Sequence, residues 1–591
     1  AGLLKPEDCR LILPIANQSR EVECADILST GCVNSTDFAC VECGMFPLSS
    51  NVERLAASAP HLIIADTEIG NYLDGHNRAE LRLATRTKTL YFYQQNCRFA
   101  WGLTASKRTI HAYVFGPDDI WVSTEMNITS IKGCQALISL LVNWLLSPID
   151  SLGFDPSIRY LVDGSIDSDP YLEIDVDEMD ESTGRVEQRT YYSQQCVGAA
   201  DRLTGRHDRY FAASTSLGML GTPEFLVKEM WTISNSDSAS YAYESWFINE
   251  LHAEFDQSSE FSGRFPQIIG TGPVYINRGG MLVLDSTVTA FAGLPTTTQD
   301  ATENSSKPRG LSKSKIQSPS SSNDRQHMRT VLQWTGNIIS AAANLSQVVI
   351  AISDAMVALN EAFVKCKILH GNLSDRAIQF QKTADGIREV LADFDYASYS
   401  GASPDATKAD APEMMLFQSI RALERLVGPE VRGMHSRAHS QARSSRLDDW
   451  ESILYIICML GTFGINQADR NEYPAGESSF PHIKTWNLGN TVNATEVKRE
   501  HMDTERSFYV NIASKMDDGP LRHLAVDMHR ILFLHPECHG AMVSLEEVDP
   551  LVTRNNFEDA IVTALLALME KYRREALLAL QPQENAVSQN K

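Results

Sequence analysis

The stretch ILHGNLSDRAI, residues 368–378, decides the fold of this chain. It is a polar loop that opens with His370, places Asn372 two residues further on and Ala377 five residues after that. A later apolar run leads to the triplet Asp393-Phe394-Asp395. A polar loop followed by an aspartate at the end of a strand-like run is the order in which phosphoryl-transfer sites place their base and their magnesium ligand. Asp393 is therefore the candidate metal ligand.

A lysine and a glutamate upstream extend the pattern. FLVKEMW (225–231) is predicted to be a strand, and it carries Lys228 between apolar neighbours. YESWFINEL (243–251) begins a helical pattern at Glu244, so Glu244 is the candidate ion-pair partner of Lys228, with Glu250 as the alternative. A lone lysine on a strand is usually a solvated charge. The prediction of a functional site therefore rests on the order of these residues along the chain and not on any one of them alone.

The motifs together resemble the fungal-type protein kinase family. ILHGNLS is similar to a family loop of the form H-G/R-D-I-S-x-x-N, and DFDYA stands where a DFG motif is usual. DDWESILYIICML, which holds Asp449, is similar to the family stretch D-L-E-S-F-x-Y-V-L. Further similar stretches are CRFAWGLT (97–104), LGFDPSIRY (152–160), VKEMW with Trp231, and HIKTWNLGNTVNATEVKREHM (482–502) with Trp486. The resemblance extends over roughly residues 85–535.

This resemblance implies an α+β, bilobal protein-kinase-like fold. A small mixed β lobe with one key helix would precede a larger, mainly helical lobe, and an N-terminal α+β elaboration would be added to them. The implied roles are an ion pair of Lys228 with Glu244 at the nucleotide, a catalytic loop holding His370, a magnesium ligand at Asp393, and a structural brace at Asp449.

The departures from the family pattern affect several functions at once. Asn372 stands at the catalytic aspartate position and lacks useful basicity, a loss that costs on the order of 10²–10⁴ in rate. Ala377 stands at the position of the second magnesium ligand and offers no oxygen to a hard cation. The glycine-rich loop falls on GRHDRYFAA (205–213), where only Gly205 is retained and His207 replaces the second glycine, so we expect its side chain to crowd a bound phosphate.

The end of the activation segment also departs from the family. Arg421 in LFQSIRAL falls where a glutamate is usual. A literal Ala411-Pro412-Glu413 lies nearby, but it is too early relative to Asp449 and is interpreted as coincidence.

Two functional hypotheses follow. The first is a pseudokinase with weak or absent binding of ATP and magnesium, which works as a binding or regulatory module for an unknown protein partner. The alternative is an active ATP-dependent Ser/Thr-type protein kinase with a divergent catalytic loop, in which Asp375 replaces the missing base.

The resemblance, together with the composition of the linker, implies six parts of the chain. They are a cysteine-containing leader (1–88), a family-specific α+β segment (89–200), the small lobe and hinge (201–295), a disordered linker (296–325), the large lobe (326–545), and a C-terminal helix and tail (546–591). The linker is rich in Ser, Thr, Pro and Lys and nearly lacks apolar residues, so we expect ready proteolysis there. The hinge is expected near VLDSTVTAFAG (283–293).

Periodicity predicts several elements within these parts. FAWGLT and TIHAYVF are predicted to be paired strands, and CQALISLLVNWLL a helix. The acidic stretch 163–183 is interpreted as a solvated loop, and helical spacing is expected over 328–366. A final amphipathic helix is predicted after possible caps at Asn555 and Asn556.

Net charge and cysteine content limit the partners and the cellular compartment that we expect for this protein. The net charge of −23 over 591 residues disfavours binding to nucleic acid. No stretch is interpreted as a signal peptide or a membrane-spanning helix, so the protein is expected to be intracellular, cytoplasmic or nuclear, without a membrane partner. The cysteines are interpreted as reduced thiols, with a zinc site at Cys24, Cys32, Cys40 and Cys43 as the less favoured reading.

Overall fold

The computed structural model forms two compact units. It describes residues 10–14, 38–42, 61–66, 80–161, 171–180, 185–233, 244–255, 263–291, 325–400, 416–426, 445–464, 483–534 and 550–580, with gaps of a few residues inside some of these ranges. One unit comprises Ala1–Asp237 with Ile269–Leu332, and the other comprises Ser238–Ile268 with Gln333–Lys591. The linker residues 296–324 and the four candidate zinc cysteines lie outside what the structure describes in side-chain detail.

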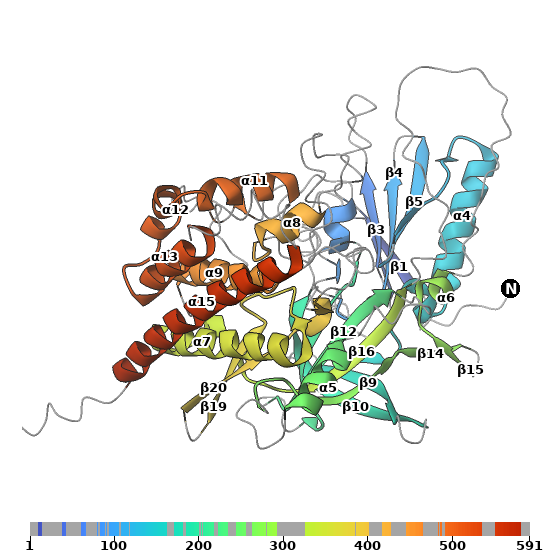
Figure 1. The fold of residues 1–591 in the computed structure, drawn as a ribbon. Coiled ribbons are helices and arrows are strands. Elements are labelled where there is room, and N and C mark those ends of the chain that lie inside the picture. The colour runs from blue at the N-terminus through green and yellow to red at the C-terminus, as the bar shows by residue number, and fades with distance from the viewer. Residues whose placement is uncertain are drawn as a thin grey trace, which may run out of the picture. The chain divides into compact units, whose positions relative to one another are not determined.

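The first sheet of the first unit has a helix packed on it. Its strands are β1 (Arg10–Pro14), β2 (Phe38–Glu42), β3 (His61–Asp66), β4 (Ala100–Ala105), β5 (Thr109–Phe115), β6 (Ile120–Val122) and β7 (Met126–Asn127). The predicted pairing is confirmed, since β4 and β5 are antiparallel neighbours. The predicted helix is confirmed as α4 (Ile131–Leu146), which lies beside this sheet (Figure 1). Its Trp144 belongs to a buried cluster with Leu103 of β4 and Ala112 of β5. The side chain of Ser130 caps the N-terminus of α4 by accepting from Gly133 N.

The second sheet of this unit carries Lys228. Its order is β13 (Ile268–Pro273), β16 (Arg325–Gln333), β12 (Phe225–Ile233), β11 (Arg209–Ser214), β10 (Arg185–Ala199), β9 (Tyr171–Asp180) and β8 (Ile158–Leu161). The loop interpretation of the acidic stretch was wrong for β9, because Leu172, Ile174 and Val176 alternate with acidic residues and are buried. The predicted boundary at residue 200 separates β10 from β11, which are neighbours in this sheet.

The connection between the units differs from the sequence expectation. The stretch expected as a hinge forms β15 (Met281–Leu284), which pairs with β14 (Tyr275–Arg278), and the short helix α6 (Thr287–Phe291). The chain crosses between the units after Asp237 and after Ile268, and it passes to the second unit for the last time after Leu332. Helical spacing over 328–333 was also wrong, because these residues complete the strand β16, which is buried along most of its length, its charged residues included, and therefore shows no alternation of apolar and polar residues.

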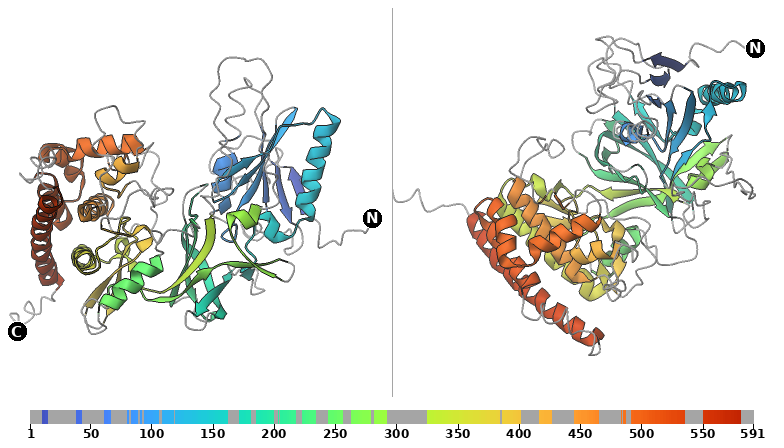
Figure 2. Two further views of the ribbon diagram at one scale, coloured as in Figure 1. Left: turned by 45° about the vertical axis from the view of Figure 1, so that its right-hand side comes forward. Right: turned by 90° about the horizontal axis from the view of Figure 1, so that it is seen from above.

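The second unit is mainly helical. Its helices are α5 (Glu244–Glu254), α7 (Leu345–Glu361), α8 (Ile420–Leu426), α9 (Arg446–Phe463), α11 (Thr491–Met502), α12 (Glu505–Asn511), α13 (Pro520–Phe533) and α15 (Pro550–Leu580). Short strands are β17 (Asn337–Ile338), β18 (Ile368–Leu369), β19 (Ile378–Thr383), β20 (Gly386–Leu391) and β21 (Ser398–Tyr399). Almost every residue of α9 is buried, so this helix forms the centre of the unit (Figure 2).

One helical stretch of the described residues, Leu345–Cys366, is long and apolar enough to cross a membrane by length and composition. It comprises α7 and a π-helical turn at Ala362–Cys366, and 67% of its most apolar window is buried inside the unit. Mostly buried helices of this kind form the cores of folded domains.

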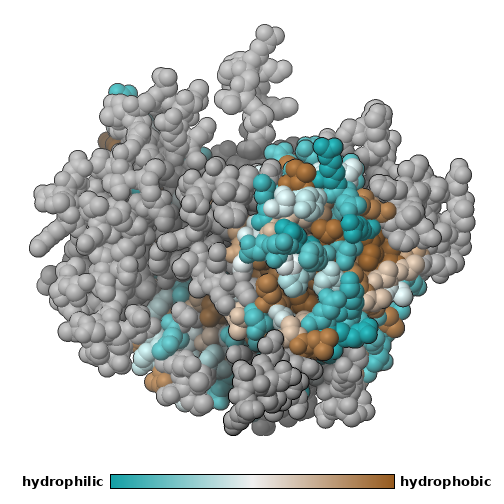
Figure 3. All heavy atoms as spheres, turned by 90° about the vertical axis from the view of Figure 1, so that its left-hand side faces the viewer, coloured by the Kyte–Doolittle hydropathy of each residue, from teal (hydrophilic) through white to brown (hydrophobic). Residues whose placement is uncertain are grey.

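The C-terminal helix is longer than the sequence indicated. It begins at Pro550, so Asn555 and Asn556 lie inside it rather than capping it. Proline suits the first turn of a helix, where its missing N–H leaves no bond unmade. The predicted apolar side is confirmed at Ile561, Leu565 and Tyr572, which are buried. The helix lies along α7 and α13 on the face shown in Figure 3.

Candidate functional site

Asp449 holds the loop that begins at His370. Its two carboxylate oxygens accept hydrogen bonds from the backbone N–H groups of His370, at 2.9 Å, and Gly371, at 2.8 Å. Gly371 has φ of +77°, a conformation that glycine adopts without strain, and a Cβ there would meet the carbonyl oxygen of Tyr396. The His370 ring nitrogen Nε2 lies 2.9 Å from the carbonyl oxygen of Ala392. The start of the loop is therefore fixed both to α9 and to the residue that precedes Asp393.

Asn372 uses both ends of its amide inside this site. Its Nδ2 donates to Oδ2 of Asp393 at 3.3 Å, and its Oδ1 accepts from Nε2 of Gln418 at 3.3 Å. The residue at the catalytic aspartate position is thus a neutral bridge between a carboxylate and a glutamine. Gln418 was not singled out in the sequence, since nothing in its local pattern shows that the chain returns to Asn372 there.

The other two loop positions are buried. Ala377 has no exposed surface, and its carbonyl oxygen accepts from Ala392 N at 2.8 Å. Its methyl group brings no oxygen to the position of a second metal ligand. Asp375, the alternative base, is 7% exposed. Its role as a base stays a prediction.

Three carboxylates converge on the Asp393 triplet. Oxygens of Glu244, Asp393 and Asp395 all lie within 4.8 Å of one another, and Oε1 of Glu244 accepts from Phe394 N at 3.0 Å. Asp393 itself has φ of +69°, in the left-handed region. Three hard oxygen donors at this spacing fit one divalent cation such as magnesium. Asp395 was not predicted to be a ligand from the sequence, although it stands where the DFG motif has glycine.

Glu244 and Glu250 have separate surroundings. Glu250 accepts a hydrogen bond from the hydroxyl of Tyr399, which in turn accepts from Nε1 of Trp246 at 2.9 Å. Glu250 does not belong to the carboxylate group at Asp393. Between the two glutamates, Glu244 is thus the one positioned at the metal-ligand triplet.

Lys228 is buried in the other unit. It lies on β12, is 1% exposed, and its Nζ lies 5.2 Å from the centre of the Tyr210 ring. Because Lys228 and Glu244 belong to different compact units, their ion pair stays a prediction.

The segment at the glycine-rich-loop position is anchored to its own unit. Gly205 N donates to the carbonyl of Pro117 at 2.5 Å, and the carbonyl of Arg206 accepts from Trp231 N at 2.7 Å. His207 has φ of +50°, so the backbone retains the left-handed conformation that favours glycine. Its ring is buried beside Tyr91, and burial together with the charge of Arg209 lowers the pKa of His207 to about 3. This side chain is neutral and points into the protein core.

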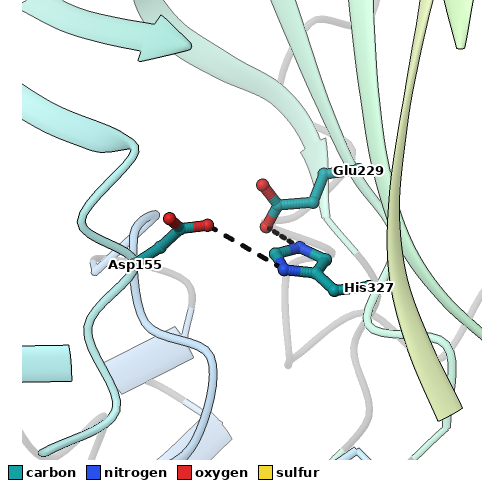
Figure 4. A group of neighbouring side chains, drawn as sticks. All are labelled: Asp155, Glu229 and His327. Carbon is teal, nitrogen blue, oxygen red and sulfur yellow. Dashed lines mark ion pairs between the residues drawn. The ribbon is translucent and has the colours of Figure 1, made fainter. Parts of the chain in front are cut away.

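A buried charge network lies in the same unit, around the residue that follows Lys228. Figure 4 shows Asp155, Glu229 and His327, whose ligand atoms lie within 4.8 Å of one another. The guanidinium of Arg329 binds both carboxylates, with its Nη2 at 2.5 Å from Asp155 and 2.9 Å from Glu229. Asp285 adds a third carboxylate, 2.8 Å from Nδ1 of His327. Arginine already supplies the positive charge between these carboxylates, so the group fits an ion-pair network better than a metal site.

The network connects the N-terminal part of the chain to the sheet of Lys228. Arg98 pairs with Asp285 at 2.6 Å, and Arg209 pairs with Glu229 at 2.9 Å and donates to the carbonyl of Cys97. Burial alone would raise the pKa of Glu229, but the charges of His327 and Arg329 outweigh it and hold that pKa well below its usual range. Burial likewise lowers the pKa of His327, and the charge of Glu229 outweighs it, so the net shift is upward. The opposite charges of the network thus stabilise one another in their ionised forms.

A buried lysine on α11 supports the site. Lys498 has no exposed surface, and its Nζ donates to the carbonyls of Leu416 and Gln418 at 2.9 and 2.6 Å. Burial lowers its pKa well below the usual value, although the charge of Glu451 opposes this. Lys498 therefore fixes the backbone of the same Gln418 whose side chain reaches Asn372.

Comparison with known families agrees with this geometry. The chain matches the family described as fungal protein kinase over residues 62–241 and 267–460. The chain therefore belongs to the fungal protein kinase family, and the predicted α+β kinase-like fold class is confirmed. The match begins earlier and ends earlier than the predicted 85–535. It includes Lys228, Asn372, Asp393 and Asp449, and it leaves out the segment that holds Glu244.

Two further comparisons add little. A solved structure titled as the crystal structure of the yeast RNA Pol II CTD kinase CTDK-1 complex is similar at 10% identity and a TM-score of 0.27, over 54% of this chain and 82% of that one. No curated protein matches the sequence.

Proposed function

We propose that this fungal-kinase-family protein is a pseudokinase that works as a binding or regulatory module and has negligible phosphotransfer. The observation that carries the proposal is the neutral bridge of Asn372 between Asp393 and Gln418. In an active enzyme this position holds a carboxylate that accepts the proton of the substrate hydroxyl. An amide nitrogen that already donates to Asp393 cannot accept that proton.

The donor set supports at most a reduced metal site. Glu244, Asp393 and Asp395 would hold one magnesium ion, which supplies charge stabilisation for a phosphate group when it is bound. A second magnesium ion is not supported, because the buried methyl group of Ala377 offers no ligand atom. Asn372 keeps its amide on Asp393 and so competes with a cation for that oxygen.

The phosphate-binding loop supports weak or absent ATP binding. A glycine-rich loop binds phosphate by closing its backbone over the ligand. In this chain the segment is anchored at Gly205, Arg206 and His207, and the four consecutive residues Arg206–Arg209 are buried. Moving it onto a nucleotide would require breaking these contacts.

The test is a radiolabel transfer assay with ATP and a generic protein acceptor at matched magnesium. The unmodified chain should show background transfer only. The double variant Asn372→Asp with Ala377→Asn should raise transfer above that background by roughly 10-fold or more, because it restores the base and a metal ligand. Asp393→Ala in the double variant should remove the gain.

Two outcomes separate the alternatives. Robust transfer by the unmodified chain that is abolished by Asp393→Ala and by Asp375→Asn would establish the active kinase with Asp375 as its base. If neither form transfers phosphate, nucleotide binding measured by calorimetry with and without magnesium decides whether the segment at His207 is the remaining block.

A further inference from the structure

The two neighbours of the Asn372 side-chain amide fix its orientation. Nδ2 of Asn372 lies 3.3 Å from Oδ2 of Asp393, and an ionised carboxylate only accepts hydrogen bonds, so the NH₂ end of the amide must face Asp393. The carbonyl oxygen Oδ1 then faces Gln418, whose Nε2 donates to it at 3.3 Å. The amide therefore turns its only oxygen away from Asp393.

That amide oxygen has the chemistry of a metal ligand. Magnesium and manganese bind carboxylate and carbonyl oxygens, whereas the NH₂ group of an amide offers them no lone pair. Glu244, Asp393 and Asp395 already bring three carboxylate oxygens within 4.8 Å of one another. A half-turn of the Asn372 amide would exchange a hydrogen-bond donor beside Asp393 for an oxygen ligand. The orientation of this amide thus decides whether residue 372 opposes a cation or helps to bind it.

Gln418 is held firmly in the position from which it donates. It is 3% exposed, and its carbonyl oxygen accepts from Nζ of Lys498 on α11 at 2.6 Å. Two residues later, Ile420 N donates to Oε1 of Glu451 on α9 at 2.7 Å. A turn of the Asn372 amide alone would bring its NH₂ group against the NH₂ group of Gln418, two donors with no acceptor between them. Gln418 therefore favours the orientation that opposes a cation.

We propose that Gln418 is a positioning residue that keeps the cation site weak, because it holds the Asn372 amide with its NH₂ group toward Asp393. The proposal rests on the reduced metal site of the proposed function, and it assigns the control of that site to a residue outside the loop that begins at His370. While Gln418 donates to Oδ1, a cation competes with the amide for Asp393 and gains no oxygen from Asn372.

The test measures Mn²⁺ binding to the full chain by electron paramagnetic resonance of the free ion, without nucleotide or phosphotransfer. Asp393→Ala should remove the site and so identifies it. Gln418→Met keeps the length of the side chain but removes the donor, and it should tighten binding at this site by roughly 3- to 10-fold, the worth of one hydrogen bond. Gln381→Met is the matched control, since the Gln381 amide donates to the carbonyl of Trp334 at 3.2 Å. It should change the affinity by less than about 2-fold.

A second set of variants separates the amide from its surroundings. Gln418→Glu keeps the shape of the glutamine but turns its donor into an acceptor, so it should hold the Asn372 amide in the opposite orientation and tighten binding by roughly 10-fold or more. Part of that gain comes from the added negative charge. In the Asn372→Ala background, Gln418→Met should therefore change the affinity by less than about 2-fold, and Gln418→Glu should keep only the contribution of its charge.

Specific results would overturn the proposal. Equal Mn²⁺ affinity of the unmodified chain and of Gln418→Met would show that the Gln418 amide turns together with that of Asn372. Equal gains with Asn372 and with Ala at position 372 would assign them to something other than the amide. Absence of an Asp393-dependent site from every variant would remove the metal site itself.

Two further measurements keep these results unambiguous. Thermal unfolding of each variant keeps a folding defect from imitating a change in affinity, and if Gln418→Met does not fold, the isosteric Gln418→Glu compared in the two backgrounds carries the test. Phosphotransfer is measured independently by the radiolabel assay, so transfer by the unmodified chain would reject the pseudokinase and leave the role of Gln418 to the Mn²⁺ data.

Discussion

The side-chain amide of Asn372 donates a hydrogen bond of 3.3 Å to the carboxylate of Asp393. The dipole of the Asn372 amide partly compensates the negative charge of Asp393. An aspartate at position 372 would instead repel Asp393 unless a cation lay between the two carboxylates. The asparagine at the base position therefore also changes how strongly Asp393 depends on a metal ion to balance its charge. We therefore expect this one side chain to have two consequences, the loss of the base and a reduced dependence on magnesium.

Replacing Asn372 with aspartate should make the stability of the second unit depend on magnesium. Two carboxylates at this distance repel, so Asn372→Asp should lower the unfolding free energy by ~1 kcal/mol without metal. Millimolar magnesium should restore it, while the unmodified chain should respond little. Thermal unfolding across a magnesium titration measures both effects. Asn372→Ala is the control, since it removes the hydrogen bond without adding charge, and an equal magnesium response there would contradict the explanation.

Replacing Asp449 with asparagine should loosen the catalytic loop. The carboxylate accepts from two backbone N–H groups, and an asparagine amide would turn a donor toward one of them. Leaving a buried N–H unsatisfied costs roughly 1–3 kcal/mol, so urea unfolding should show a loss in that range. Hydrogen exchange at His370 and Gly371 should accelerate in the variant. The exposed Glu570→Gln is the control, and loss of the same size there would argue against a brace.

Acid should destabilise the second unit through His529. Burial lowers the pKa of His529 to about 4, and its ring is stacked on Phe508. The folded state keeps this histidine neutral, whereas the unfolded chain takes up a proton below about pH 6.5. The unfolding free energy should therefore fall as the pH drops from 6.5 toward 4, by about 1–2 kcal/mol at pH 5.

Variants separate this histidine from the others. His529→Gln should flatten the pH dependence of the unfolding midpoint between pH 7 and 5, apart from the part due to His207, whose pKa is lowered in the same direction. His523→Gln, at a position 66% exposed, should leave the dependence unchanged. A slope that is the same in both variants would refute the assignment to His529.

Breaking the buried network of the first unit should be far more costly than breaking a surface pair. Arg329→Met would leave Asp155 and Glu229 without their shared cation, at a cost of about 3–5 kcal/mol. Arg159→Met removes two ion pairs, with Glu173 and Asp175, from a side chain that is 44% exposed, and should cost less than about 1 kcal/mol. Urea unfolding of both variants checks the difference. Similar small losses would show that the network contributes little to stability.

Much of the local structure could be predicted from the sequence. The strand of Lys228, the helix that begins at Glu244 and the helix that carries Asp449 follow from periodicity and end signals within a few residues. The errors lie where neighbouring signals compete. The acidic residues of β9 obscure its alternating apolar side, and β16 is buried along most of its length, so its sequence shows no alternation of apolar and polar residues.

The sequence by itself determined which chemical groups are present: an amide at Asn372, a methyl group at Ala377 and an extra carboxylate at Asp395. Only the tertiary structure decided what they contact. Gln418 reaches Asn372, and Arg329 reaches Asp155, across long stretches of chain, because hydrogen bonds and ion pairs depend on where the backbone returns. The same holds for His207, whose identity marks a lost glycine but whose burial shows that the segment is fixed to its own core. Residue types are local information, whereas desolvation and pairing arise only when distant segments pack together.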